Sequence, residues 1–308
     1  MPLGLCCHYV EERKPGVLTN LFDTRTLQLG RWQRGEYSEE RVRNTYLHNA
    51  RSMLKVIPLV VASGVRHLRF SCDLIPLGDK VPREWWDNNE LRSAYKAIGD
   101  YCRAHGVRPS CHPGQFCVLN SRRDDVIANA IEEMSRHAWV FDACEFPMSP
   151  EASINIHAGC KDEFAKLVSS ITSLPHFIRT RLTLENDENV ASVSDLVHVN
   201  TSVGVPIVFD SHHHTFNDGN DTMQQAYDAA MRTWPANIMP VQHISNTEPA
   251  LENGSRLDRR KHSFFIQSIP EPQLEGIRRR EIALEVECKS KNLGISKMVA
   301  DFDLRNYI

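Results

Sequence analysis

The sequence predicts an α/β fold of the TIM-barrel class, a single (β/α)8 barrel that occupies residues 1–308 as one domain. Short apolar runs rich in β-branched residues alternate with longer segments of helical periodicity, which is typical of parallel β/α folds. Eight such runs can be counted, and 308 residues suit a barrel of this kind. No Pro-, Gly- or Ser-rich linker divides the chain.

The eight candidate strands are short, and several are apolar throughout. This composition is expected of parallel strands that are buried on both faces. In chain order the predicted strands are Leu3–Cys7, His67–Cys72, Arg108–Cys111, Ser153–His157, Leu182–Glu185, Pro206–Asp210, Met239–His243 and Ile282–Glu285.

Three intervening segments show clear helical spacing of their apolar residues. Glu39–Ser63 is predicted as a helix that Pro58 interrupts, because proline removes a backbone hydrogen bond and clashes with the preceding turn. Leu91–His105 and Asp124–Cys144 are predicted as uninterrupted helices. Two polar segments are predicted as loops, Thr215–Thr222 and Asn246–Asp258.

Composition indicates an intracellular globular protein. No apolar run approaches the roughly 20 residues of a membrane-spanning helix, and the first residues lack the pattern of a secretory signal. The nine cysteines are scattered, with only Cys6 and Cys7 adjacent and no C-x-x-C pair. We therefore expect free, mostly buried thiols in a reducing compartment.

The net charge of −3 is not typical of a protein that binds nucleic acid. Positive side chains are nevertheless clustered, and the clusters can either line a phosphate-binding rim or form ordinary solvated faces. These clusters are Arg122–Arg123, Arg256 with Arg259–Lys261, Arg278–Arg280, and Lys289 with Lys291.

Six consecutive predicted strands have His, Asp or Glu at or just beyond their C-terminal ends. In a parallel barrel these ends converge on one mouth, where barrel enzymes hold their active sites. One such histidine would ordinarily be structural, but six residues in register predict a common site. The six are His112, His157, Glu185, Asp210, His243 and Glu285.

Divalent metal ions are the simplest explanation of this cluster. Buried carboxylates without positive partners would cost several kcal/mol each or become protonated. Mixed imidazole and carboxylate ligands suit Zn, Mn, Fe or Co. Because Glu185, Asp210 and Glu285 can each bridge ions, we expect a multi-metal site of the kind that hydrolyses phosphodiesters. From His212–His214, only one or two side chains are expected to point inward.

Five motifs, in this order and spacing, resemble the UV damage endonuclease family over nearly the whole chain. They are Leu68–Pro76, Ser110–Ser121, Ile154–Gly159, Leu184–Asp187 and Val208–His214. The resemblance implies a barrel related to the endonuclease IV group of nucleases. It also implies an enzyme that uses up to three metal ions, usually described as manganese. The implied reaction is hydrolysis of the phosphodiester immediately 5′ to a cyclobutane dimer, a 6-4 photoproduct or an abasic site in double-stranded DNA.

The resemblance also implies roles for eight ligands. Glu185 would bridge two ions, with Asp210 and Glu285 as the other catalytic carboxylates. His262 lies in a loop segment, and periodicity alone does not single it out. The implied sets are His112 and His157 for one ion, Asp210, His243 and Glu285 for the second, and His213 and His262 for the third.

Gln115 and Phe116 match the pair that family members insert into the duplex at the lesion. An aromatic ring can replace unstacked bases, and an amide can hydrogen-bond to exposed base edges. Two positions depart from the family pattern. Val241 stands where many members carry a lysine, and Glu287 stands where the family favours lysine, which leaves Lys289 as the expected phosphate neighbour.

Two other functions are compatible with a metal-binding barrel. A sugar isomerase or epimerase also gathers carboxylates and imidazoles at strand ends, but it needs a closed pocket for a small substrate. The His-Pro-Gly-Gln-aromatic loop and the basic segments favour a long anionic polymer instead. A non-catalytic binder of damaged DNA has no support, since all eight implied ligands are present.

Overall fold

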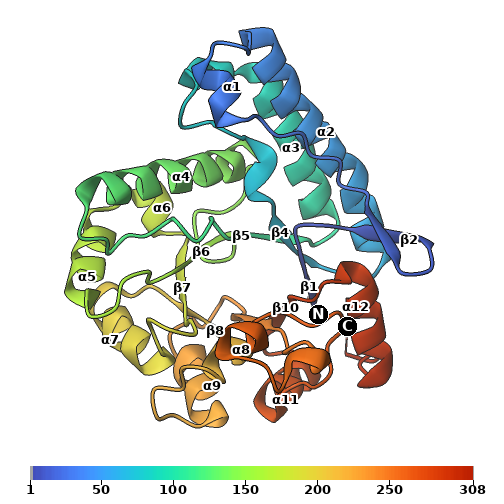
Figure 1. Cartoon of the computed structure of the whole chain (residues 1–308), viewed down its shortest axis with the longest axis vertical. Coiled ribbons are helices and arrows are strands. Elements are labelled where there is room, and N and C mark those ends of the chain that lie inside the picture. The colour runs from blue at the N-terminus through green and yellow to red at the C-terminus, as the bar shows by residue number, and fades with distance from the viewer. Residues whose placement is uncertain (1–2, 308) are drawn as a thin grey trace.

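A computed structural model describes residues 3–307, and eight parallel strands in it close into a barrel surrounded by helices (Figure 1). The order around the barrel is β1-β10-β9-β8-β7-β6-β5-β4. The barrel strands are β1 (Leu3–Cys6), β4 (His67–Phe70), β5 (Arg108–Cys111), β6 (Ser153–His157), β7 (Leu182–Glu185), β8 (Ile207–Asp210), β9 (Val241–Ile244) and β10 (Ala283–Val286).

Each barrel strand is followed by at least one helix on the outside of the barrel. The principal helices are α2 (Glu39–Ala62), α3 (Asn89–Ala104), α4 (Asp124–Ala143), α5 (Phe164–Ser173), α7 (Val193–Val203), α9 (Met223–Met231), α11 (Glu271–Arg279) and α12 (Lys291–Asp301). The shorter ones are α1 (Leu29–Gln33), α6 (His176–Arg179), α8 (Ser211–His214) and α10 (Arg256–Arg259).

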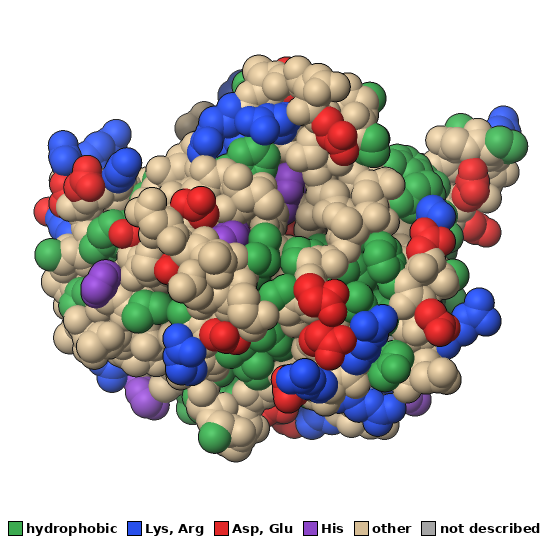
Figure 2. Space-filling view, turned by 90° about the horizontal axis from the view of Figure 1, so that it is seen from below, with side chains coloured by type: hydrophobic (Ala, Val, Ile, Leu, Met, Phe, Trp, Pro, Cys, Tyr) green, Lys and Arg blue, Asp and Glu red, His purple; other side chains and the backbone are tan. Residues whose placement is uncertain are grey.

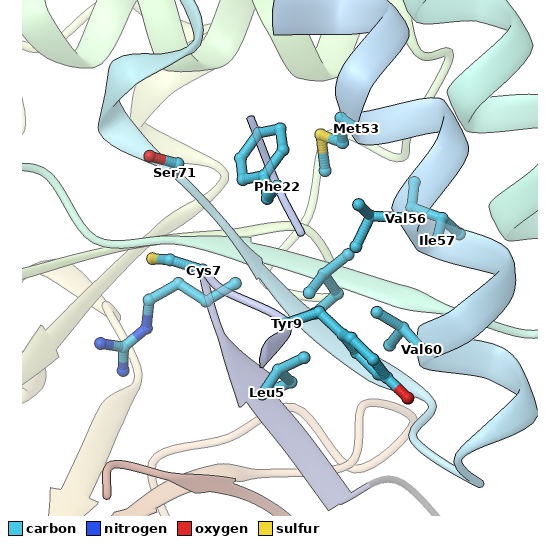
Figure 3. A pocket seen from close by; sticks show the side chains of 11 residues that line it. Leu5, Cys7, Tyr9, Phe22, Met53, Val56, Ile57, Val60 and Ser71 are labelled. Atoms are coloured by element: carbon cyan, nitrogen blue, oxygen red, sulfur yellow. The ribbon is translucent and has the colours of Figure 1, made fainter. Parts of the chain in front are cut away.

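The main apolar core lies between the barrel and these helices. Side chains alternate along a strand, so one set of each strand faces outward. Phe70 of β4 makes edge-to-face contacts with Phe141 of α4 and with Phe146. Figure 3 shows how α2 packs on the barrel, with Met53 and Ile57 facing β1 across a small apolar cavity.

The eight predicted strands are confirmed to within two residues at each end. The expected interruption at Pro58 is wrong, because α2 runs without a break from Glu39 to Ala62. Ile57 and Val60 are fully buried on either side of the proline. Packing against the barrel therefore keeps the helix continuous despite the missing backbone donor.

A two-stranded antiparallel hairpin that the periodicity did not predict follows β1. It consists of β2 (Val10–Lys14) and β3 (Val17–Asn20), and it projects from the barrel beside α2 (Figure 1). All nine cysteines are free thiols, as expected. Within residues 3–307, no helix has the length and apolar character needed to cross a membrane.

Candidate metal centre at the barrel mouth

Strand pairing aligns five of the predicted ligands in two sets, which are offset by two residues where Glu185 of β7 pairs with Val208 of β8. His157 pairs with Glu185 across β6 and β7, and His243 pairs with Asp210 on one side and with Glu285 on the other. Paired residues on neighbouring strands point to the same face of the sheet. The register therefore places these side chains together inside the mouth of the barrel.

Glu185 lies at the centre of the cluster and is almost completely buried. Its carboxylate oxygens lie 3.1 Å from Nε2 of His112, 3.1 Å from Nδ1 of His243 and 3.3 Å from Nδ1 of His213. Burial opposes its charge, but His243 and His157 hold the pKa of Glu185 well below its usual range. The carboxylate is therefore ionised and faces imidazole nitrogens from several strands.

Polar side chains one layer deeper hold Glu185 in position. The Asn155 amide donates a hydrogen bond to Oε2 of Glu185, and the Thr183 hydroxyl donates to Oδ1 of Asn155 at 3.0 Å. Asn155 and Thr183 precede His157 and Glu185 by two residues, so each lies on the same face as its ligand. Buried hydrogen bonds of this kind fix the orientation of a metal ligand.

Glu285 is held by a different set of partners. One oxygen accepts hydrogen bonds from the Ser110 hydroxyl and lies 2.7 Å from Nε2 of His67, whereas the other accepts from Nε of Arg69 at 2.6 Å. Burial opposes its charge, but Arg69 and His243 hold the pKa of Glu285 well below its usual range.

Two groups of potential ligand atoms consist entirely of predicted residues. The donor atoms of His112, His157 and Glu185 all lie within 4.8 Å of one another, and so do those of Glu185, Asp210 and His213. Glu185 belongs to both groups, as a bridging ligand would. The donor set, imidazoles with carboxylates, is one that transition-metal ions accept.

Two buried polar atoms of the cluster have no hydrogen-bond partner and could bind a cation. Oδ2 of Asp210 and Nδ1 of His157 have no hydrogen-bond partner although both are buried. The other oxygen of Asp210 accepts a hydrogen bond from the backbone of His213 at 2.7 Å. Because a buried, unsatisfied carboxylate oxygen is costly, an ion at this position would stabilise the site.

His262 stands apart from the other predicted ligands. It follows α10, and its side chain is 33% exposed. Its Nδ1 lies 3.8 Å from a carboxylate oxygen of Glu287, and its ring centroid lies 5.9 Å from that of His212. Within the described part of the chain, the compact ligand groups do not include His262.

Selecting His, Asp and Glu residues at the ends of predicted strands missed several polar residues of the barrel interior. Arg69 and Glu287 lie directly among the predicted ligands, and His67, Ser110 and Asn155 support them from below. A sequence signal for the supporting residues existed. Ser110 and Asn155 lie two residues before His112 and His157, and His67 lies two residues before Arg69, so each is on the same alternating face as the residue two positions after it.

The predicted lesion-contacting residues lie on the loop after β5. Phe116 is 81% exposed, although it is a large apolar side chain, and Gln115 beside it is also exposed. The loop is anchored where the backbone N–H of Gly114 donates to Glu133 of α4 at 2.9 Å. Lys289 is exposed after β10 and forms an ion pair with Glu248 at 3.1 Å.

One of the basic clusters cannot line the mouth. Arg278–Arg280 ends α11 and leads into the N-terminal end of β10, which lies at the opposite end of the barrel from the cluster. Arg122–Arg123 and Arg256–Lys261 follow β5 and β9, so they lie at the mouth. Figure 2 shows acidic and basic side chains interspersed on one side of the molecule, in keeping with the net charge of −3.

The fold and the cluster define a class of protein, the TIM-barrel enzymes that build a polar active site at the C-terminal ends of their strands. A family described as "UV-endonuclease UvdE" matches residues 1–308. The chain belongs to this UV endonuclease family, as its motifs led us to expect.

Similar proteins agree with this assignment. The UV DNA damage endonuclease of Nostoc sp. is 32% identical over 303 residues, which cover 96% of this chain and 88% of the relative. The UV DNA damage endonuclease of Deinococcus radiodurans is 28% identical and covers 89% of both chains. Among solved structures, that of SacUVDE superposes with a TM-score of 0.81 at 26% identity and covers both chains completely.

Sugar epimerases share the fold at a greater distance. The structure of an L-ribulose 3-epimerase superposes with a TM-score of 0.55 at 9% identity. Such a match shows a common barrel architecture alone. The isomerase or epimerase alternative therefore has only a distant fold relation to support it.

Proposed function

We propose that the protein hydrolyses the phosphodiester immediately 5′ to UV photoproducts in double-stranded DNA, with divalent metal ions, manganese foremost, at the barrel mouth. The observation that carries the proposal is the convergence of His112, His157, His213 and His243 on the buried carboxylate of Glu185. Membership of the UV endonuclease family supports the choice of DNA as the substrate.

Glu185 would bridge two ions, with His112 and His157 on one side and Asp210, His243 and Glu285 on the other. His213 and His262 would hold a third ion. When bound, such ions activate water and stabilise the leaving oxygen in phosphodiester hydrolysis. The chain's own contribution is to hold the carboxylates ionised and oriented through the hydrogen bonds of Asn155, Ser110 and His67.

Gln115 and Phe116 would recognise the lesion. An exposed aromatic ring on an anchored loop can enter a base stack at little cost where the stack is already weakened. A photoproduct distorts and unstacks the duplex, so selectivity can follow from deformability without any reading of sequence. Lys289 would contact a phosphate once its ion pair with Glu248 is broken.

The test is incision of a supercoiled plasmid. We expect the purified protein with Mn²⁺ to nick UV-irradiated plasmid, to leave unirradiated plasmid intact and to be inhibited by EDTA. Glu185→Gln should reduce nicking by at least a hundredfold because the central ligand is neutralised, while Glu145→Gln, on the surface beside Lys96, serves as the matched control. Normal cleavage by Glu185→Gln, or turnover of a ketose with no action on irradiated DNA, would overturn the proposal.

A further inference from the structure

We propose that Glu287 is an additional metal ligand, placed between His243 and His262. This inference rests on the proposed metal centre and adds to it a residue that neither the strand-end pattern nor the family resemblance singles out as a ligand. Glu287 contributes to the third compact group of potential ligand atoms, which also contains Cys6 and Glu285.

The backbone places Glu287 over the mouth. It follows Glu285 by two residues, so the two side chains share one face of the sheet. Its backbone N–H donates to the carbonyl of Ile244 at 2.8 Å, which extends the pairing of β10 with β9 one residue beyond Val286. Its side chain is only 16% exposed. The carboxylate is therefore fixed at the rim of the cluster and does not extend freely into solvent.

Each oxygen of the Glu287 carboxylate faces a different imidazole. Oε1 lies 3.4 Å from Nδ1 of His243, and Oε2 lies 3.8 Å from Nδ1 of His262. Both distances exceed those of ordinary hydrogen bonds, about 2.7–3.2 Å. They are close to the separation of about 3.4 Å between two donors that share one ion at about 2.1 Å in a tetrahedral site. The spacing therefore suits a carboxylate that bridges an ion bound by His243 and an ion bound by His262.

The competing explanation is that Glu287 serves only as the counter-ion of Arg69. Arg69 does contact Oε1 of Glu287 at 2.5 Å, but the same guanidinium also binds Glu285. One positive charge is thus shared between two buried carboxylates. Arg69 contacts Oε1 of Glu287, whereas Oε2 lies 3.8 Å from Nδ1 of His262, and a simple ion pair with Arg69 does not require that second approach.

The first experiment measures metal binding directly. Mn²⁺ is titrated into metal-free protein with the free ion followed by electron paramagnetic resonance, and bound metal is counted by mass spectrometry after gel filtration. We expect Glu287→Gln to weaken at least one Mn²⁺ site tenfold or more and to lower the number of ions per chain. Glu248→Gln, the same change at a surface carboxylate paired with Lys289, should bind like the wild type. Equal affinity and count in Glu287→Gln and wild type would overturn the inference.

A second experiment separates a ligand from a counter-ion. If Glu287 acts only as the counter-ion of Arg69, then replacing Glu287 in the Arg69→Gln variant should not change Mn²⁺ binding any further. We expect Glu287→Gln to weaken Mn²⁺ binding in this background as well, and loss of the effect there would contradict direct ligation. Wild-type protein that binds ions but leaves irradiated DNA intact would overturn the proposed function alone and leave the ligand measurements valid.

Discussion

Single residues at the barrel mouth are arranged in two layers. Predicted ligands form the upper layer, and Asn155, Thr183 and Ser110 form the lower layer. Asn155 and Ser110 donate hydrogen bonds to predicted ligands, and Thr183 donates a hydrogen bond to Asn155. The lower layer is polar although it lies inside the barrel, because each of these groups has a specific partner: Glu185 for Asn155, Glu285 for Ser110 and Asn155 for Thr183. The position of a predicted ligand such as Glu185 thus depends on residues beneath it in the barrel.

Gly4 of β1 provides a test of this packing. It is aligned with Glu285, and a Cβ atom at this position would lie 2.7 Å from Cγ and 2.9 Å from Cα of Glu285. We expect Gly4→Ala to displace Glu285, to lower Mn²⁺ affinity about tenfold and to destabilise the fold by about 1–3 kcal/mol, the usual cost of overpacking. Gly30→Ala, in the exposed helix α1, is the control. Wild-type metal binding by Gly4→Ala would contradict the packing argument.

Phe116 provides a second test at the residue scale. Because its ring is exposed and makes no part of the core, Phe116→Ala should leave the melting temperature unchanged. Loss of stacking at an opened base step costs about 1–3 kcal/mol, so affinity for irradiated duplex should fall about tenfold to a hundredfold. Fluorescence anisotropy with irradiated and unirradiated oligonucleotides measures the effect. An equal loss for both DNAs would show that Phe116 does not discriminate damage.

At the scale of elements, strand register is what assembles the site. His157 is level with Glu185, and Asp210 is level with His243 and Glu285, while Glu185 lies opposite Val208, two residues before Asp210 on the same face. A shift of one residue in any strand would turn its ligand outward, toward the helices. Helix packing stabilises the register, since the outer faces of these strands are buried against α4, α7, α9 and α12.

Helix α4 carries a buried histidine that should make stability depend on pH. Burial, assisted by the positive charge of Arg136, lowers the pKa of His137 from 6.5 to about 3. The unfolded chain then binds more protons below pH 6.5, so stability is lost progressively as the pH falls from 6.5 toward 3. Each unit of pKa difference corresponds to about 1.4 kcal/mol.

Urea unfolding of the metal-free protein between pH 7 and pH 4 measures this dependence. We expect His137→Gln to flatten it, whereas His198→Gln, at an exposed position on α7, should leave it as in the wild type. A wild-type slope in His137→Gln would show that other groups carry the effect.

At the scale of the whole molecule, the distribution of charge matters more than its sum. The chain carries a net charge of −3, yet it belongs to a family named for cutting DNA. Four acidic side chains lie inside the mouth, Glu185, Asp210, Glu285 and Glu287, and their combined charge, which bound cations would neutralise, exceeds the net charge of −3. The basic segments that follow β5 and β9 lie at the same end of the barrel, but side chains such as Arg122 and Arg260 are paired with Glu163 and Glu188 and would have to exchange these partners for DNA phosphates.

Metal loading should therefore stabilise the entire fold. Ions that bind only the folded chain add about 2.7 kcal/mol at a hundredfold excess over the dissociation constant. We expect the melting temperature to rise by several degrees with Mn²⁺ and to fall again with EDTA, as followed by scanning calorimetry. Glu185→Gln should respond less. The same melting temperature with and without Mn²⁺ would contradict a metal centre at the mouth.

The sequence by itself determined the barrel and the cluster of predicted ligands. The apolar pattern of a strand can be recognised within a few residues. The C-terminal ends of parallel strands meet at one mouth irrespective of the loop conformations. Those two facts located His112, His157, Glu185, Asp210, His243 and Glu285. His213 and His262 came from family resemblance, because a short turn and a loop carry no periodic signal.

Only the tertiary structure decided the rest. Pro58 does not break α2, because packing energy gathered over the whole helix outweighs one lost hydrogen bond. Arg278–Arg280 lies at the far end of the barrel, which depends on where α11 ends. Glu287, which the sequence marked only as a lost positive charge, contacts Arg69 and faces two predicted ligands. Such contacts join residues far apart in the chain, and no local pattern encodes them.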